Sequence, residues 1–140
     1  MGVQTRKLMR TLREGAQVER VLQENGQEFI AQPLPQALAQ LLEENGVTRA
    51  QAIHDAMLNN IYGYQIFSGA RTPSRDKLLA LAFGMRLSYE QTDTLLKTQG
   101  YARLYARRRR DAVIIHGLMH QTPLLEVNTR LYENGWDTLS

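Results

Sequence analysis

Apolar residues that recur three and four positions apart are the feature that most constrains what this chain can fold into. Leu38, Leu41 and Leu42 show this spacing, and several later segments repeat it. Such a spacing places apolar side chains on one face of a helix. No segment shows the sustained alternation of β-branched residues that is typical of a strand. The sequence therefore predicts an all-α protein.

Turn and cap residues divide this pattern into separate helices. Thr48 and Ser88 each stand three residues before a Gln, which is the spacing of a capping box. Thr72-Pro73 predicts another helix start, with Thr72 as the cap and Pro73 at the first helical position. The tripeptide Glu-Asn-Gly occurs three times and predicts helix ends, because glycine adopts a left-handed conformation cheaply. The predicted helices span residues 5–25, 35–45, 49–57, 60–68, 73–83, 89–100, 106–119 and 123–134.

The chain divides into three predicted parts. Residues 1–34 form an N-terminal helical arm that ends in a proline-containing linker, and residues 35–100 form a five-helix domain. Residues 101–140 form a C-terminal helical hairpin. Four aromatic residues of this last part are expected in the core of packed hairpins or on a dimer surface, namely Tyr101, Tyr105, Tyr132 and Trp136.

An internal repeat supports the packing of two hairpins. The sequence aligns with itself without gaps at an offset of 35 residues, so that Arg75-Asp76 matches Arg110-Asp111. Each copy would be a hairpin that cannot bury its apolar side alone, so the two copies should stack. The matched Arg and Asp residues are candidates for equivalent structural ion pairs.

Composition excludes several classes of function. The chain of 140 residues has no Cys, which excludes disulfides, thiolate zinc sites and cysteine nucleophiles. No apolar run approaches the roughly 20 residues of a membrane span, and no secretory signal follows the basic N-terminus. His116 and His120 stand four apart on a predicted helix, but no further ligand completes a metal site. Without a phosphate loop, a nucleophile elbow or paired carboxylates, we expect a cytoplasmic protein that is neither an enzyme nor cofactor-dependent.

Positive charge is concentrated in the middle of the chain. Residues 71–110 carry ten basic and three acidic side chains, a local charge of +7, although the whole chain carries only +3. A localised basic stretch is typical of a phosphate-binding protein, and it is also typical of a solvated helix face. The densest run, Arg107-Arg108-Arg109-Arg110, is a secondary basic patch for nucleic acid or an acidic partner.

Two short predicted helices, residues 49–56 and 60–68, are joined by a tight turn. This is the geometry that lets the second helix of a helix-turn-helix pair enter a DNA groove. The exposed side of the second helix offers Asn60, Tyr64 and Gln65. Asn and Gln are the residue types that form paired hydrogen bonds with adenine in the major groove.

The sequence Ile-Phe-Ser-Gly-Ala-Arg-Thr-Pro-Ser-Arg over residues 66–75, followed by Leu-Leu-Ala-Leu-Ala, resembles the XRE family of phage-repressor-like helix-turn-helix regulators. The resemblance covers about residues 35–100 and implies a repressor-like five-helix DNA-binding domain. Residues 104–115 resemble the C-terminal extension of a bacterial branch of this family. The resemblance implies base contacts by Asn60, Ile61, Tyr64 and Gln65, and phosphate contacts by Arg49, Arg71 and Arg75.

Two positions depart from the family pattern. Met57 stands in the motif turn where the family usually has a glycine, so a left-handed backbone would be strained there. Gly63 lies within the reading helix, where the family commonly buries an aliphatic side chain. We expect Tyr62 or Tyr64 to fill the space that Gly63 leaves.

The sequence thus predicts a transcriptional regulator that binds a specific site on double-stranded DNA as a homodimer. A protein partner at the C-terminal hairpin is a further expectation. A second interpretation remains open, a helix-turn-helix-like adaptor that contacts proteins and does not bind DNA. It is favoured by the net charge of −2 over residues 35–70 and by a reading helix with no Lys or Arg.

Overall fold

The computed structural model describes Met9 and residues 32–140. The chain forms two compact units, Met1–Pro33 and Leu34–Ser140. The predicted helix at 5–25 lies, apart from Met9, outside the described residues. The described residues contain seven helices and no strand, which confirms the all-α prediction. None of the described helices is long and apolar enough to cross a membrane.

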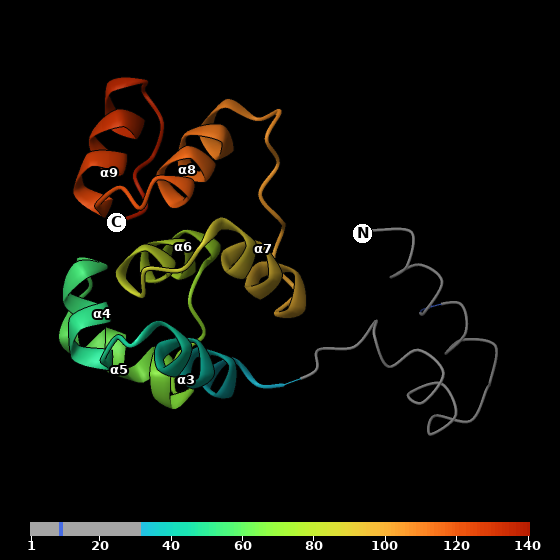
Figure 1. The fold of residues 1–140 in the computed structure, drawn as a ribbon, viewed down its shortest axis with the longest axis vertical. Helices are drawn as coiled ribbons and strands as arrows, with labels where there is room; N and C mark the ends of the chain where they lie inside the picture. The colour runs from blue at the N-terminus through green and yellow to red at the C-terminus, as the bar shows by residue number, and fades with distance from the viewer. Residues whose placement is uncertain (1–8, 10–31) are drawn as a thin grey trace. The chain divides into compact units, whose positions relative to one another are not determined.

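The second unit is built from three groups of helices. In Figure 1, α6 and α7 lie between the group α3–α5 and the pair α8–α9. Contacts between α4 and α6 join the first two groups, and the contacts of α6 with α9 and of α7 with α8 join the last two. The helices are α3 (Leu34–Asn45), α4 (Arg49–Asp55), α5 (Asn60–Ser68), α6 (Arg75–Gly84), α7 (Tyr89–Thr98), α8 (Arg109–Met119) and α9 (Leu124–Glu133).

Side-chain caps start the helices that carry the candidate site. The Thr48 hydroxyl accepts from the Gln51 amide at the start of α4, and Ser88 forms a complete capping box with Gln91 at α7. The predicted cap at Thr72 is wrong. Ser74 caps α6 instead, because its side chain accepts from the Lys77 amide and the helix begins after it.

The helix ends share one hydrogen-bonded motif. In six of the seven described helices, a left-handed residue follows the helix, and the next amide donates to the carbonyl five residues back. Met57, where the resemblance implies a glycine, has a left-handed backbone with a φ of 57°. The left-handed residues of this motif are Gly46, Met57, Arg86, Gly100, Gln121 and Gly135.

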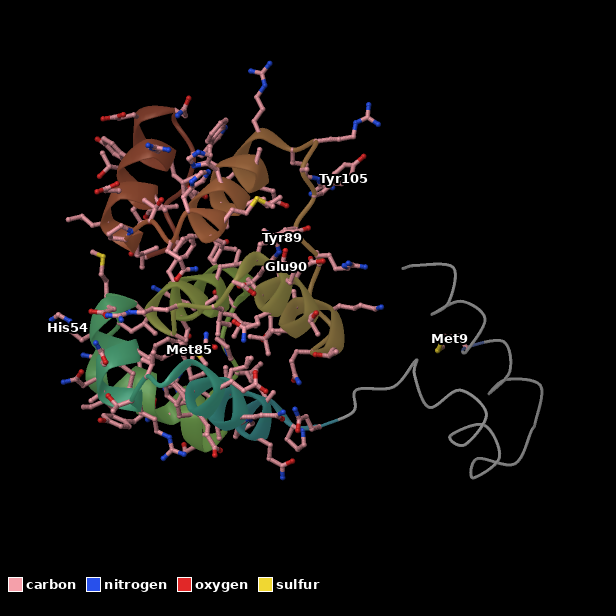
Figure 2. All side chains as sticks on the ribbon, in the orientation of Figure 1. Met9, His54, Met85, Tyr89, Glu90 and Tyr105 are labelled. Carbon is pink, nitrogen blue, oxygen red and sulfur yellow. The ribbon has the colours of Figure 1, made fainter. Side chains whose placement is uncertain are left out.

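The core runs through all three groups of helices. Figure 2 shows Met85, which has no exposed surface, in the middle of the second unit. Ile53 and Ile66 are fully buried, as expected for residues that pack α4 against α5, and Leu58 is half-buried beside them. Burial of such side chains stabilises the fold by about 1.5–3 kcal/mol each.

The two repeat copies pack crosswise. The Arg75 guanidinium contacts the Asp111 carboxylate at 3.1 Å, and the Arg110 guanidinium contacts Asp76 at 3.0 Å. Arg75 also donates to the carbonyl of Ala102, and Arg110 donates to the matching carbonyl 35 residues later. Each hairpin thus gives its Arg to the Asp of the other. Such reciprocal contacts indicate an approximate two-fold axis between the hairpins α6–α7 and α8–α9. The predicted stacking of the repeats is confirmed, and their ion pairs form between the copies.

A second contact occurs at equivalent positions in the two hairpins. The Asp93 carboxylate accepts the Leu104 amide at 3.2 Å, and the Asn128 side-chain oxygen accepts the Leu139 amide at 2.9 Å. Asp93 and Asn128 occupy equivalent repeat positions, and both side chains are buried. An acceptor at this position therefore fixes the segment that follows each hairpin.

The aromatic residues of the C-terminal part divide into two groups. Tyr101 and Trp136 are half-buried and pack against the core. The Tyr101 hydroxyl donates to the Pro73 carbonyl at 2.6 Å, and burial together with the nearby Tyr62 raises the pKa of Tyr101. Tyr105 and Tyr132 are exposed, so the core role predicted for them is wrong.

Candidate nucleic-acid interface

Close packing of α5 against α4 sets the orientation of the candidate reading surface. Asn59 caps α5 by accepting the Tyr62 amide, and Gly69 ends the helix with a φ of 87°. Gly63 is buried, and a Cβ atom there would lie 2.7 Å from two Ile53 side-chain carbons. Ile53 therefore fills the space beside Gly63, and the expectation that Tyr62 or Tyr64 fills it is wrong.

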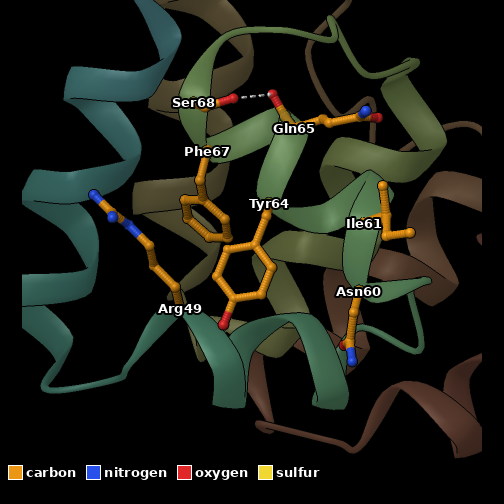
Figure 3. Close-up of a pocket in the computed structure, with 7 residues that line it drawn as sticks. All are labelled: Arg49, Asn60, Ile61, Tyr64, Gln65, Phe67 and Ser68. Carbon is orange, nitrogen blue, oxygen red and sulfur yellow. Dashed lines mark hydrogen bonds between the residues drawn. The ribbon is translucent and has the colours of Figure 1, made fainter.

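The outward side of α5 forms one wall of a groove of about 590 Å³. Figure 3 shows Asn60 and Ile61, and about one helical turn later Tyr64 and Gln65, along this side. Ile61 and Tyr64 are 71% and 47% exposed. Neither the Asn60 nor the Gln65 side-chain amide forms a hydrogen bond within the described part of the chain. The four predicted base-reading residues thus share one accessible surface.

Arg49 supplies the positive charge of this groove. It is the first residue of α4, and its guanidinium carbon lies 6.0 Å from the centre of the Phe67 ring. Figure 3 shows the two side chains next to each other, with the Tyr64 ring beside them. A cation over an aromatic face is held in place while its donors stay free for a ligand. The pairing with Phe67 was not predicted, because it joins residues 18 positions apart on different helices.

The two arginines that follow α5 have different surroundings. Arg71 is exposed, and its backbone amide donates to the Gln65 carbonyl, which holds it at the end of the reading helix. Arg75 does not lie in the groove. Its guanidinium is 24% exposed and binds Asp111 and two carbonyls of the α7–α8 connection. These contacts use most of the Arg75 donors within the protein, and the phosphate contact predicted for Arg75 stays a prediction.

The secondary basic patch, Arg107, Arg108 and Arg109, is fully available to solvent. All three side chains are exposed, and no ion pair involves them among the residues that the structure describes. The patch spans the end of the α7–α8 connection and the start of α8, which lie on the far side of the second unit from α5 in Figure 1.

The described residues hold no cluster of three His, Cys, Asp or Glu side chains that could bind a metal ion. His116 and His120 form a ring pair with centroids 4.2 Å apart, and Arg130 lies 3.5 Å from the His116 Nδ1 atom. A cation next to the ring opposes metal binding at that nitrogen.

We compared the chain with protein-family models, curated proteins and solved structures, and none of the three comparisons gave a match.

Proposed function

We propose that this chain is a DNA-binding transcriptional regulator of the XRE type, in which α5 reads the major groove of double-stranded DNA. The observation that carries the proposal is the pairing of two unbonded amides, Asn60 and Gln65, on the same groove as Arg49. Asn60 is exposed and Gln65 is half-buried, and neither side-chain amide has a hydrogen-bond partner among the described residues. The donor and acceptor pattern of such amides fits the edge of adenine. The helices α3–α7 would then be the repressor-like five-helix domain.

The four base-reading residues on α5 have separate roles in this proposal. Asn60 and Gln65 would hydrogen-bond to base edges, with about 1–3 kcal/mol of discrimination for each good bidentate pair. Ile61, which is 71% exposed, would contact a thymine methyl group. Tyr64 would lie at the margin, where its ring meets Arg49 and its hydroxyl can donate to a phosphate.

Phosphate contacts would come from two arginines that lie before and after the reading helix in the sequence. Arg49 lies beside Phe67 in the groove, and Arg71 is exposed just after α5. Because α5 itself carries no Lys or Arg, affinity would depend on these two cations and on a second copy of the chain. A homodimer would double the contacts and read two half-sites. A regulator of this kind acts in the bacterial cytoplasm.

The test is fluorescence anisotropy of the full chain with labelled duplex fragments over a salt series. We expect salt-dependent binding to a preferred fragment that is lost in the double variant Asn60→Ala, Gln65→Ala. Arg49→Ala should weaken binding to all fragments and lower the slope of log affinity against log salt by about one for each protomer. Arg108→Ala is the matched control, an exposed arginine on the far side of the unit, and should leave the preference unchanged.

The adaptor interpretation has one observation in its favour. Ile61 and Tyr64 give the α5 groove an exposed apolar centre, which suits a protein surface as well as a thymine methyl. Wild-type protein that shows no salt-dependent affinity for any duplex would contradict DNA binding and favour the adaptor.

A further inference from the structure

A second groove, of about 770 Å³, lies where three helix turns meet. The turns are those that join α4 to α5, α6 to α7 and α8 to α9. Buried or half-buried apolar side chains form its floor, and Arg86 and Asp55 lie at its polar edge. Figure 2 shows His54, which also lines the groove, pointing outward from α4. The apolar side chains of the floor are Phe83, Leu87, Leu118 and Leu124.

The left-handed turn residues that line this groove carry side chains, whereas the other described turns of the same motif have glycine. Six helix ends have the same left-handed motif, and three of them use glycine, which carries no steric penalty there. The other three use Met57, Arg86 and Gln121, and all three line this groove. A left-handed conformation costs a residue with a side chain about 1–2 kcal/mol. Within the described part of the chain, a left-handed residue with a side chain therefore occurs only at a position that lines this groove.

Two of these three side chains already have partners, and they differ in how tightly they are held. The Gln121 amide donates to the Leu87 carbonyl at 3.1 Å, which ties two of the turns together. Arg86 is 60% exposed, and its guanidinium approaches Asp55 only at 4.0 Å. No hydrogen bond from the Arg86 side chain occurs among the described residues. Apart from this long contact with Asp55, its donors are unoccupied at the edge of an apolar floor.

We propose that this groove binds a small organic anion with an apolar body, a carboxylate or sulfonate of drug-like size. The volume lies within the range of ligand pockets, which pair an apolar lining with a few directed polar groups. The apolar body would cover the floor formed by Phe83, Leu87 and Leu118. The acidic group would take the free donors of Arg86, because a guanidinium binds a planar or tetrahedral anion through two parallel hydrogen bonds.

Such a ligand would also touch the turn that precedes the reading helix. Met57 is 49% exposed in the groove and stands two residues before Asn59, the cap of α5. Occupation of the groove would shift this turn and so change how α5 meets DNA. This consequence rests on the proposed function, whereas the binding of the anion does not.

The experiment uses two probes that share one apolar body. 8-Anilinonaphthalene-1-sulfonate has the anionic group, and N-phenyl-1-naphthylamine is the same body without it. We expect saturable fluorescence enhancement of the sulfonate at one probe per chain. Arg86→Gln should weaken the sulfonate about tenfold and the neutral probe less than twofold, since only the sulfonate uses the guanidinium. Thr122→Trp, at a half-buried position that lines the groove, should abolish binding of both probes.

Arg108→Gln is the matched control, because it removes an exposed arginine far from the groove and should leave both probes unaffected. Circular dichroism melts would show that each variant is folded. Equal weakening of both probes by Arg86→Gln, or unchanged binding in Thr122→Trp, would overturn the anion site. In a second arm, saturating sulfonate should change the DNA affinity of wild type and leave that of Thr122→Trp unchanged. Binding of the probe with no change in DNA affinity would overturn only the coupling to α5.

Discussion

Met57 holds a left-handed backbone that a glycine would adopt without strain, and its side chain makes no hydrogen bond that would compensate. We predict that Met57→Gly raises the free energy of unfolding by about 0.5–1 kcal/mol. The relief of strain should exceed the extra chain entropy of glycine in the unfolded state. Urea denaturation monitored by circular dichroism measures this change.

Gln121→Gly is the matched comparison, since Gln121 has a φ of 52° in the same motif. Its amide donates to the Leu87 and Leu118 carbonyls, so the loss of about 1 kcal/mol per hydrogen bond should cancel the relief of strain. Equal changes of stability in Met57→Gly and Gln121→Gly would show that the hydrogen bonds of Gln121 are not what distinguishes the two turns.

Gly63 allows α5 to lie close to α4, and this contact can be tested with a double-mutant cycle. Gly63→Ala should destabilise the fold by about 1–3 kcal/mol, although Ala favours a helix, because the new methyl group would overlap Ile53. In an Ile53→Ala background the same change should be neutral or stabilising, which equilibrium unfolding of the four proteins would reveal. Equal costs in both backgrounds would contradict the packing described for α5.

At the scale of helices, the crosswise ion pairs of the repeat differ in burial. Asp111 is 7% exposed in its side chain, whereas Asp76 is 37% exposed. We predict that Asp111→Asn lowers the free energy of unfolding by about 3 kcal/mol, because Arg75 would keep an uncompensated charge. Asp76→Asn should cost about 1 kcal/mol or less, since water screens the more exposed pair.

The chain supplies its own control for this comparison. Asp93→Asn should cost less than about 1 kcal/mol, because the repeat already uses Asn128 for the same amide contact and Arg103 is exposed. Chemical denaturation of the three variants measures the free energy of unfolding of each and so ranks the contributions of the three carboxylates to stability. An Asp111→Asn variant as stable as Asp93→Asn would contradict the structural role assigned to the Arg75 contact.

Local signals explain which elements could be predicted from the sequence. The bounds of α5 follow from the polar Asn59-Asn60 pair and from Gly69, whose effects act within one helical turn. The cap of α6 is predicted at Thr72 because Pro73 suits the first helical position, yet Ser74 is an equally competent cap. The choice of Ser74 depends on how the segment between α5 and α6 packs, and no local pattern reports that.

Contacts between distant residues explain what the sequence could not predict. Arg75 looked free for DNA because its partner Asp111 lies 36 positions away and is reached only when the repeats pack crosswise. The four residues of the α5 surface could be predicted, since their spacing alone places them on one side of a helix. The groove between the three turns could not, because His54, Arg86 and Gln121 meet only in the folded unit.

At the scale of the whole molecule, α3–α7 carry the α5 surface, and the pair α8–α9 is fixed to them by the crosswise contacts. The central claim is that Asn60 and Gln65 read bases. The most direct measurement is selection of binding sites from a pool of random duplexes, with wild type and the variant Asn60→Ala, Gln65→Ala processed in parallel. We predict that wild type enriches an inverted repeat with a fixed adenine in each half, and that the variant loses preference at those positions. Enrichment of no motif by wild type, or of the same motif by both proteins, would contradict the account.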